Sequence, residues 1–420
     1  MTVSGNSKET YDIAVAGAGI VGVSCALWAQ MRGMRVLLAD GNPPGSGASY
    51  GNAGTIATYG CIPVNSPSLF RDLPKLLFSK TAPLRIDWGY ALTHLPWMLK
   101  FLRNCTPDRV RHISMSLGDL LSHTDAGLDP LVEAAGAGDM FIQNDFIYAY
   151  ATRAGYEGAL HGIEVRRRNG VELEFLDPGE ILELEPNLRM PLHAGVRFVN
   201  GRHARDPQRL VQRLFDRFIA DGGTYVQTNV TSCKPDNDGV SLALSDGTTQ
   251  RAGQFVIAAG AHSKSIVGSG AEDLPLDTER GYHVQFKDHA RLVSRPVAWA
   301  EGGFYATPFD AGLRLAGTVE IAGLNASKTP KRIDVLTQRA HDMFGDIGEP
   351  DSDWMGFRPT MPDSLPVIGR SARSDRILFA FGHQHIGFTL GGITGRIIAD
   401  LAEARAPNFD ISAFSSQRFS

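Results

Sequence analysis

The sequence has 420 residues, of which 43% are hydrophobic and 20% are charged, and its formal net charge is −4 at pH 7. This length predicts two or three domains with sizeable cores, and the composition is that of a soluble globular protein. The slight negative charge gives no electrostatic case for nucleic acid, and four cysteines without C-x-x-C spacing fit a reducing compartment better than a disulfide scaffold.

A short apolar run near the N-terminus leads into three glycines with the spacing G-x-G-x-x-G. The run Tyr11–Ala16 precedes Gly17, Gly19 and Gly22, a helical pattern follows, and the next apolar run ends in Asp40. This order of strand, turn, helix, strand and acid is what a dinucleotide requires, with the pyrophosphate at the helix N-terminus and the acid on the adenosine ribose. The motif alone does not distinguish NAD from FAD, and an ordinary glycine-rich turn is the alternative.

Two segments after Asp40 allow more than one interpretation. Residues 41–54 are too rich in Gly and Pro for a regular element, and they predict either a backbone that passes close to a flat cofactor or a plain surface loop. Residues 66–102 mix large apolar side chains with Lys and Arg and are interrupted by Pro74, Pro83 and Pro96. This second segment predicts either an amphipathic patch that touches a membrane surface or helices and turns that face the core.

Hydrophobic periodicity and turn signals predict the remaining elements. Helices are expected over 108–135, 155–168, 207–221 and 331–345, and from 387 onward. Strands are expected over 141–150, 240–245, 255–261 and 377–381, and over most of 275–330. The basic cluster Arg166–Arg168 predicts a solvated face. No second G-x-G-x-x-G follows a strand, so the chain has one nucleotide site, whereas a flavin reductase fed by NAD(P)H usually needs two.

Several segments together resemble the FAD-dependent D-amino-acid oxidase superfamily, which includes glycine oxidase, sarcosine oxidase and the D-amino-acid dehydrogenases. The resemblance is carried by residues 17–22, Asp40, and residues 47–54, 256–263, 356–369 and 382–401. The loop 48–54 and the apolar-basic stretch after it look most like the D-amino-acid dehydrogenase branch, which includes hydroxy-D-proline dehydrogenases.

The resemblance implies a mixed α/β and α+β fold. A Rossmann-like FAD-binding domain is expected to be interleaved with a strand-rich substrate domain. The FAD-binding domain is expected over 9–65, 196–274 and 352–414, and the substrate domain over 66–195 and 275–351.

The resemblance also implies FAD that is held without a covalent bond. The sarcosine oxidase branch attaches its flavin to a C-terminal cysteine, and this chain has no cysteine after Cys233. The start of the last helix is expected at the flavin pyrimidine edge, where a helix N-terminus stabilises the negative charge of the reduced ring. The cofactor residues implied are Gly17, Ala18, Gly19, Ile20, Val21, Gly22, Asp40, Gly47, Ala48, Ser49, Asn52, Ala53, Gly54, Val230, Ala259, Gly260, Gly387, Phe388 and Thr389.

Three residues are implied at the substrate. Arg358, in a G-x-R-P motif, and Tyr305 match the pair that holds the substrate carboxylate in this family, and an Arg fork suits a carboxylate. The structural alternative for Arg358 is an ion pair with Asp363. His385 stands where glycine oxidase has a second carboxylate-binding Arg, so it contacts substrate or flavin, or stays neutral and shapes the pocket. His383 is expected to support the turn, and no metal site is expected because His383 and His385 have no evident partner ligands.

The resulting interpretation is oxidative deamination of a D-amino acid, or of a cyclic imino acid such as D-proline or hydroxy-D-proline. Hydride passes from Cα to flavin N5, no dedicated base is required, and the electrons go to a quinone or another acceptor that is not NAD. The alternatives are an oxidase that makes hydrogen peroxide from O2, and a non-catalytic FAD-binding subunit or redox sensor. We expect no transmembrane helix, because the uncharged run 13–31 has its glycines placed as a phosphate loop. A cytoplasmic location is expected, with peripheral contact of residues 69–102 at the cytoplasmic face of the membrane as an option.

Overall fold

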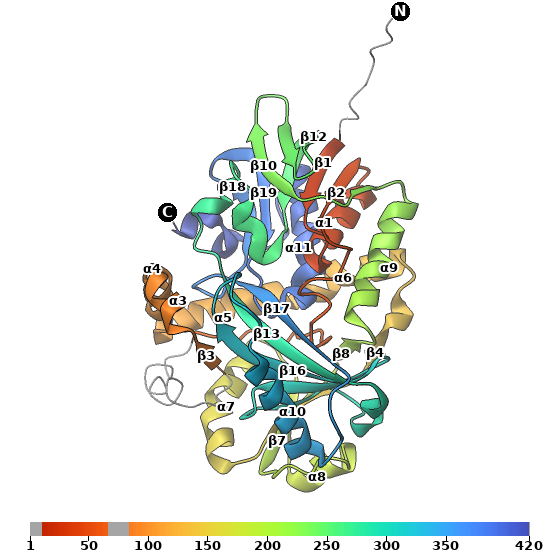
Figure 1. Ribbon diagram of the computed structural model, residues 1–420, viewed down its shortest axis with the longest axis vertical. Helices are drawn as coiled ribbons and strands as arrows, with labels where there is room; N and C mark the ends of the chain where they lie inside the picture. The colour runs from red at the N-terminus through yellow and green to blue at the C-terminus, as the bar shows by residue number, and fades with distance from the viewer. Residues whose placement is uncertain (1–10, 66–83, 420) are drawn as a thin grey trace, which may run out of the picture.

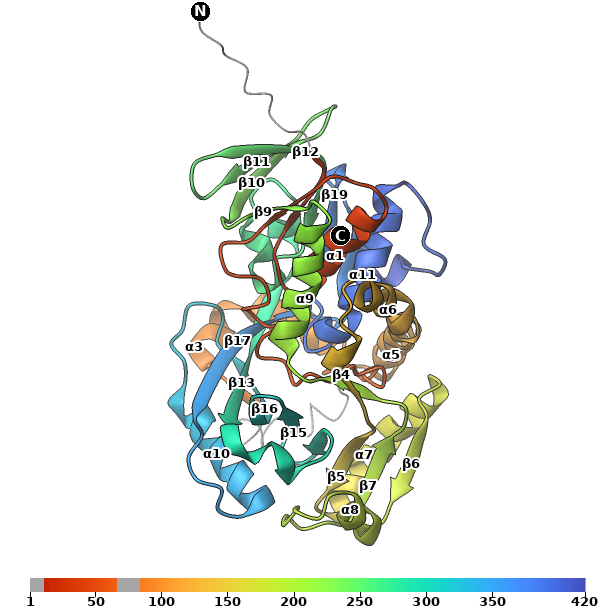
Figure 2. The ribbon, with the colours of Figure 1, turned by 90° about the vertical axis from the view of Figure 1, so that its right-hand side faces the viewer.

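The computed structural model describes residues 11–65 and 84–419, and these form two large sheets that occupy the upper and lower halves of Figure 1. The view in Figure 2 shows the same separation from the side. The chain passes between the two sheets several times, which confirms the predicted interleaved α/β and α+β fold. No helix within the two described ranges is both long enough and apolar enough to cross a bilayer.

The first sheet has eight strands, in the order β10-β11-β12-β1-β2-β9, with β19 pairing β12 and β18. Its strands are β1 (Tyr11–Ala16), β2 (Val36–Ala39), β9 (Thr224–Val226), β10 (Val230–Pro235), β11 (Val240–Leu244), β12 (Thr249–Ile257), β18 (Val367–Ser371) and β19 (Ser374–Phe381). The strands β9, β2, β1, β12 and β19 run parallel to one another. One face is covered by α1 (Ile20–Met31), α5 (Pro107–Ser122), α6 (Thr124–Ala134), α9 (Pro207–Ala220) and α11 (Gly387–Ala402), which share one hydrophobic core with it.

The second sheet has nine strands, in the order β17-β13-β16-β15-β14-β5-β7-β6, with β3 pairing β16. Its strands are β3 (Leu84–Ile86), β5 (Phe146–Tyr150), β6 (Leu173–Leu176), β7 (Ala194–Phe198), β13 (Asp277–Phe286), β14 (Val297–Trp299), β15 (Phe304–Phe309), β16 (Gly312–Ile321) and β17 (Ser352–Thr360). The helices α7 (Arg153–Arg168), α8 (Pro178–Leu184) and α10 (Pro330–Phe344) lie around it in Figures 1 and 2. The short elements α3 (Trp88–Thr93), α4 (Leu95–Arg103), β4 (Phe141–Gln143) and β8 (Arg202–Ala204) complete the regular structure used below.

The predicted elements have counterparts in the structure, with local differences. The helix expected over 108–135 is two helices, α5 and α6, which meet at His123. The helix expected after Asp206 is α9, and the Asp206 carboxylate accepts a hydrogen bond from the Arg209 backbone N–H as an N-cap does. The strand expected over 141–150 is interrupted between β4 and β5.

Sheet pairing places three segments differently from the predicted domain boundaries. The predicted FAD-binding domain includes all of β17 and part of β7. In the structure, β17 pairs with β13 and β7 pairs with β5, both in the second sheet. Helices α5 and α6 were assigned to the substrate domain, but their apolar faces share a core with α1 and α11. Strands that pair with partners distant in sequence carry no local signal of the sheet to which they belong.

Glycines in α11 allow two other helices to pack unusually close to it. A Cβ built on Gly392 would lie 2.6 Å from Leu128 Cα on α6, and one on Gly395 would lie 2.6 Å from the Ser24 carbonyl carbon on α1. These contacts are backbone to backbone, so no side-chain rotation can relieve them. The position of α11 is therefore set by its two helical neighbours.

We predict that Gly392→Ala destabilises the protein by about 3 kcal/mol, because overpacking against backbone costs more than the helix propensity of alanine returns. Equilibrium urea unfolding measures the effect. The matched control is Gly158→Ala on α7, where an added Cβ meets no atom within 4 Å. That control should be stabilised by about 0.5–1 kcal/mol, as expected for Gly→Ala in an open helix. A neutral Gly392→Ala variant would contradict the close packing.

A buried histidine fastens the turn before α11. The His383 ring nitrogen Nε2 shares a hydrogen bond of 2.9 Å with the Thr394 hydroxyl, and the side chain is 3% exposed. His383 thus supports the turn, as its position in the sequence predicted. Burial lowers the pKa of His383 to about 3, so the ring is neutral at physiological pH.

Linkage makes this histidine a source of acid sensitivity. The unfolded chain binds a proton at His383 below its ordinary pKa of about 6.5, whereas the folded chain does not until about 3. The stabilisation is therefore full above pH 6.5 and decreases as the pH falls, by about 2 kcal/mol between pH 8 and pH 5. We predict that the stability difference between wild type and His383→Gln shrinks by this amount over the same range in urea unfolding. His161→Gln, at an exposed position of α7, should run parallel to wild type, and a pH-independent difference for His383→Gln would refute the prediction.

Candidate active site

The first turn of the chain places the start of α1 directly against the first sheet. Gly17 has φ +104°, and a Cβ on it would lie 2.3 Å from the Ala258 carbonyl oxygen. A Cβ on Gly22 would lie 1.8 Å from the Gly17 carbonyl oxygen. No side chain caps α1 at Gly19, so the helix presents backbone N–H groups at the ends of β1 and β12. This cradle, which any larger residue would fill, fits a pyrophosphate.

Side chains from two later segments complete the cradle. The Asp40 carboxylate accepts a hydrogen bond of 2.7 Å from the Ala18 backbone N–H, and the Ser49 hydroxyl accepts one of 3.0 Å from Ile20. Asn229, next to Val230, accepts a hydrogen bond of 3.0 Å from the Gly41 backbone N–H. The structure therefore brings the predicted residues around Gly17–Gly22, Asp40, Ser49 and Val230 to one edge of the sheet. Ala259 and Gly260 lie at the same place, directly after β12 and beside Gly17.

The loop after Ser49 is held in place by β16 of the second sheet and by helix α11. Arg314 on β16 donates hydrogen bonds from Nη1 to the carbonyl oxygens of Tyr50 (2.7 Å) and Asn52 (3.1 Å), and its side chain is 5% exposed. At the far end of the loop, the Ala57 backbone N–H donates to the Thr389 hydroxyl at 2.9 Å. Thr389 thereby joins the loop to the first turn of α11, which has no side-chain cap. Arg314 had no local motif around it and was missed by sequence reasoning.

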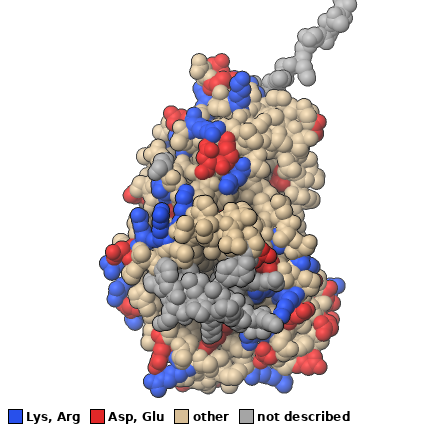
Figure 3. All heavy atoms as spheres, turned by 60° about the vertical axis from the view of Figure 1, so that its left-hand side comes forward, with Lys and Arg blue, Asp and Glu red and all other residues tan. Residues whose placement is uncertain are grey.

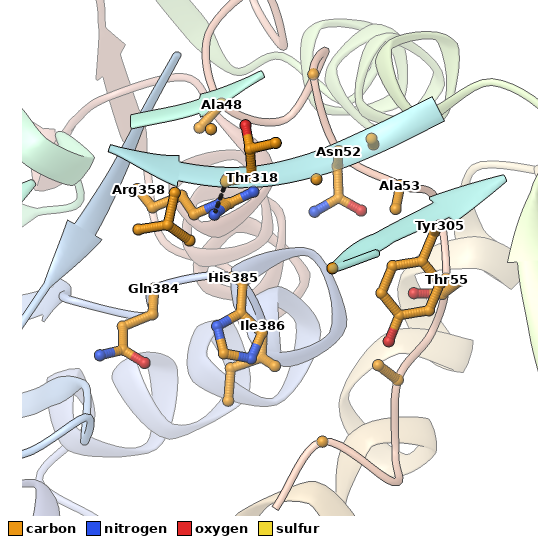
Figure 4. Close-up of a pocket in the computed structure, with 18 of the residues that line it drawn as sticks. Ala48, Asn52, Ala53, Thr55, Tyr305, Thr318, Arg358, Gln384, His385 and Ile386 are labelled. Atoms are coloured by element: carbon orange, nitrogen blue, oxygen red, sulfur yellow. Dashed lines mark hydrogen bonds between the residues drawn. The ribbon is translucent and has the colours of Figure 1, made fainter. Parts of the chain in front are cut away.

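A cavity of about 290 Å³ lies between this loop, the second sheet and the turn before α11 (Figure 4). All three predicted substrate residues, Arg358, Tyr305 and His385, line it. The cofactor-loop residues Ala48, Asn52 and Ala53 line the same cavity. The predicted substrate positions and part of the predicted flavin positions thus share one space.

Arg358 enters the cavity from β17 and is fixed by the backbone of β16. Its Nη1 donates to the Thr318 carbonyl oxygen at 3.2 Å, the contact drawn in Figure 4. Glu279 is its register partner on β13, and burial raises the pKa of that carboxyl. Burial lowers the pKa of Arg358, and the charge of Glu279 opposes this shift. Asp363, the alternative partner, is 2.6 Å from Arg418 instead.

Thr318 has an unusual backbone for a β-branched residue. Its φ is +54°, and it lies where the pairing of β13 and β16 shifts register. Its side-chain hydroxyl is buried and makes no hydrogen bond within the described residues. Such strain concentrates at functional sites, and here it accompanies the carbonyl that holds Arg358. A threonine in a strand carries no local signal of this role.

Tyr305 belongs to a cluster of three tyrosine hydroxyls on the other side of the cavity from Arg358 (Figure 4). Its hydroxyl contacts the Tyr148 hydroxyl directly and lies 3.4 Å from the Tyr59 hydroxyl. Burial raises the pKa of Tyr305 well above its usual value, and the neighbouring tyrosines add to the shift. Tyr305 therefore acts as a neutral hydrogen-bond donor and acceptor. Tyr59 and Tyr148 were not identified from the sequence.

His385 lies in the turn between β19 and α11, and its side chain is exposed within the open cavity. The protein walls around this open cavity remove water from the ring and lower the pKa of His385 to about 4, and the charge of Arg358 adds to this effect. The ring is therefore neutral at pH 7, which fits the predicted option of a histidine that shapes the pocket. Among the residues in the described ranges, no group of three or more His, Cys, Asp or Glu side chains could hold a metal ion.

One interpretation of the sequence was wrong in part. The cluster Arg166–Arg168 was expected to be a solvated face, but Arg166 is half-buried and lines the cavity. Arg167 and Arg168 are exposed, as predicted. Only the fold shows which of the three turns inward.

Relatives are found both by sequence and by structure. The chain is 34% identical over 419 residues to a D-amino-acid oxidase of Bradyrhizobium diazoefficiens, covering 98% of this chain and 99% of the relative. It is 28% identical to a D-amino acid dehydrogenase of Cereibacter sphaeroides, covering 97% and 95%. The fold is similar to that of glycine oxidase from Geobacillus kaustophilus, with a TM-score of 0.74, 23% identity and coverage of 97% and 99%. L-proline dehydrogenase from P. horikoshii has a TM-score of 0.72, 18% identity and coverage of 98% of each chain.

The family model described as FAD dependent oxidoreductase matches residues 12–401. This range includes the glycine turn, the cofactor loop, Arg358 and the start of α11. The residues present fit the cofactor, because the uncapped start of α1 and the glycine cradle suit the pyrophosphate of FAD. The chain belongs to the family of FAD-dependent oxidoreductases.

Proposed function

We propose that the protein oxidises a D-amino acid, or a cyclic imino acid such as D-proline or hydroxy-D-proline, at the bond between Cα and nitrogen. The observation that carries the proposal is Arg358, a guanidinium fixed by the Thr318 carbonyl in a cavity that also borders the cofactor loop. Two relatives with near full-length coverage carry names of D-amino-acid oxidoreductases, which supports this substrate class.

Each residue of the cavity has a role in this proposal. Arg358 binds the substrate carboxylate through its planar fork, and the Thr318 carbonyl keeps the fork oriented. His385 stays neutral beside Arg358 and so adds no competing charge. FAD, when bound, would supply the hydride acceptor, and the start of α11 would hold the edge of its ring and stabilise negative charge there. Orientation of the substrate contributes much of the rate, so no acid–base residue is assigned.

The cofactor contacts predicted from the sequence remain part of the proposal. We assign the pyrophosphate to the cradle at Gly17–Gly22, the ribose to Asp40, and the ring to the loop 47–54 and the start of α11. The cysteines are all buried, and none of them lines the cavity. FAD is therefore proposed to be held without a covalent bond.

A quinone or another acceptor that is not NAD is proposed to take the electrons. On the helices α3 and α4, the side chains of Leu92, Leu95 and Leu99 are 72%, 51% and 48% exposed. Figure 3 shows this side of the molecule, where an uncharged area adjoins Lys and Arg side chains. Such a surface suits peripheral contact with a membrane that contains quinone. Part of the segment 69–102 lies outside the described residues. The second candidate is an oxidase that uses O2, because the 34% identical relative is named as one.

The proposed function is tested by mixing the FAD-loaded protein with amino acids in the absence of oxygen. We expect D-amino acids or D-proline analogues to bleach the flavin, and a water-soluble quinone to restore its colour faster than O2 does. Rapid reoxidation by O2 with release of hydrogen peroxide would favour the oxidase. If no amino acid of either enantiomer, no proline analogue and no sarcosine bleaches the flavin, the protein is instead a non-catalytic subunit or a redox sensor.

The mode of flavin attachment is tested by acid precipitation. A non-covalent flavin should remain in the supernatant, whereas a covalent flavin would precipitate with the protein.

We predict that Arg358→Ala lowers kcat/KM for a D-amino acid by about 100-fold or more while FAD stays bound. The expected size is that of a lost charge-assisted contact. Steady-state kinetics and the flavin absorbance measure the two effects. Arg358→Ala removes the charge beside the buried Glu279 and can therefore destabilise the fold. Arg358→Lys keeps this positive charge, so this second variant should keep the fold and recover part of the activity.

The carboxylate itself can be tested by comparing a D-amino acid with its amide. Wild type should prefer the acid strongly, and Arg358→Ala should no longer distinguish the two. A variant that retains the wild-type preference would show that Arg358 does not bind the carboxylate.

A further inference from the structure

A second guanidinium lines the same cavity as Arg358. Arg166, near the end of α7, donates from Nε to the Tyr59 carbonyl oxygen at 3.1 Å. Its guanidinium carbon lies 5.6 Å from the Tyr148 ring centre and 5.7 Å from that of Phe198. These contacts fix one edge of the planar group against two aromatic rings. The two terminal nitrogens make no hydrogen bond within the described residues.

The charge of Arg166 is not balanced by a carboxylate. Two neighbours on α7 form ion pairs, Arg153 with Glu157 at 2.8 Å and Arg168 with Glu164 at 2.9 Å. Arg166 has no such partner in the described part of the chain, and no Asp or Glu is among the described residues that line the cavity. Arg358, by contrast, has the buried Glu279 beside it. The cavity therefore carries an uncompensated positive charge on the wall formed by α7 and β5.

Arg166 lies at the tyrosine side of the cavity. It stacks on Tyr148, whose hydroxyl contacts that of Tyr305. Figure 4 shows Tyr305 and Arg358 on opposite sides of the cavity. A substrate whose α-carboxylate lies on Arg358 can therefore extend its side chain toward Tyr305, Tyr148 and Arg166.

We infer that Arg166 and Tyr148 form a subsite for an anionic group at the end of the substrate side chain. Resting on the proposed function, the inference is that the enzyme prefers amino acids with a side-chain carboxylate over their neutral isosteres. An Arg fork with free terminal nitrogens suits a carboxylate, and a lysine-like side chain is repelled. Partial burial strengthens the pair relative to one at the surface, because water screens it less.

The test compares D-glutamate with D-glutamine, and D-aspartate with D-asparagine, as isosteric pairs for the FAD-loaded enzyme. We expect wild type to prefer the acid over the amide by about 10- to 100-fold in kcat/KM, the range of a charge-assisted contact. Arg166→Gln should reduce this ratio to about one. Arg166→Met keeps an apolar stem over Tyr148 and Phe198, so it should give the same ratio if the glutamine variant folds poorly. The control Arg167→Gln, at an exposed neighbour outside the cavity, should keep the wild-type ratio.

Two results would overturn the inference. One is a wild-type enzyme that does not prefer the acid to the amide. The other is an Arg166 variant that lowers kcat/KM for both members of a pair equally, as a purely structural role would. If no amino acid of either enantiomer reduces the flavin of the wild-type enzyme, the proposed function itself is wrong. If the enzyme oxidises neutral amino acids but does not prefer acidic ones, only the inference about Arg166 is wrong.

Discussion

The close contact of backbone with backbone at the first turn is the constraint on which the rest of the structure depends. Gly17 and Gly22 leave no room for a side chain between β1, the start of α1 and the end of β12. As a result, α1 can lie directly on the sheet with its N-terminus at the strand ends. The same helix then packs against α11 through Gly395, where backbone again meets backbone. The start of α11, which borders the cavity, is thus positioned from the phosphate cradle by two successive close contacts. A change in the spacing between α1 and α11 would therefore shift the glycine cradle relative to the start of α11.

The other wall of the cavity is positioned by strain rather than by close packing. A β-branched residue at φ +54°, as at Thr318, costs about 1–3 kcal/mol and persists only where the surroundings determine it. The register shift between β13 and β16 produces this conformation, and the Thr318 carbonyl then accepts a hydrogen bond from Arg358. The cavity is thus enclosed by strands of the second sheet on one side and by the cofactor loop and the turn before α11 on the other. The loop and the turn each follow a strand of the first sheet, so both sheets contribute to its position.

The parts of this arrangement that follow from local sequence could be predicted. The glycine turn, Asp40 and the G-x-R-P arginine each have a chemical reason for their spacing, and the structure brings them to one side of the first sheet and to the cavity. Residues whose role comes from tertiary contacts could not be predicted. Thr318 acts through a carbonyl in a shifted register, and Arg314 reaches the cofactor loop across 262 residues of chain. Arg166 differs from its neighbours only in the direction in which it leaves the helix. The sheet to which β17 belongs is likewise set by its partner strand β13 and not by its own composition.

The distribution of charge in the cavity connects these observations. The family resemblance placed a second arginine of glycine oxidase at the position of His385, and a histidine there stays neutral because of burial and the charge of Arg358. Positive charge is thereby removed from the turn beside Arg358, while Arg166 supplies it on the opposite wall. Two cations side by side would bind one carboxylate more tightly, but they would offer nothing to a distant group. In the proposed function, two cations on separate walls would instead favour a substrate by its length and charge, because only a molecule with anionic groups at both ends could pair with both of them. The neutral ring of His385 and the inward turn of Arg166 therefore place the two guanidinium groups that line the cavity apart from each other.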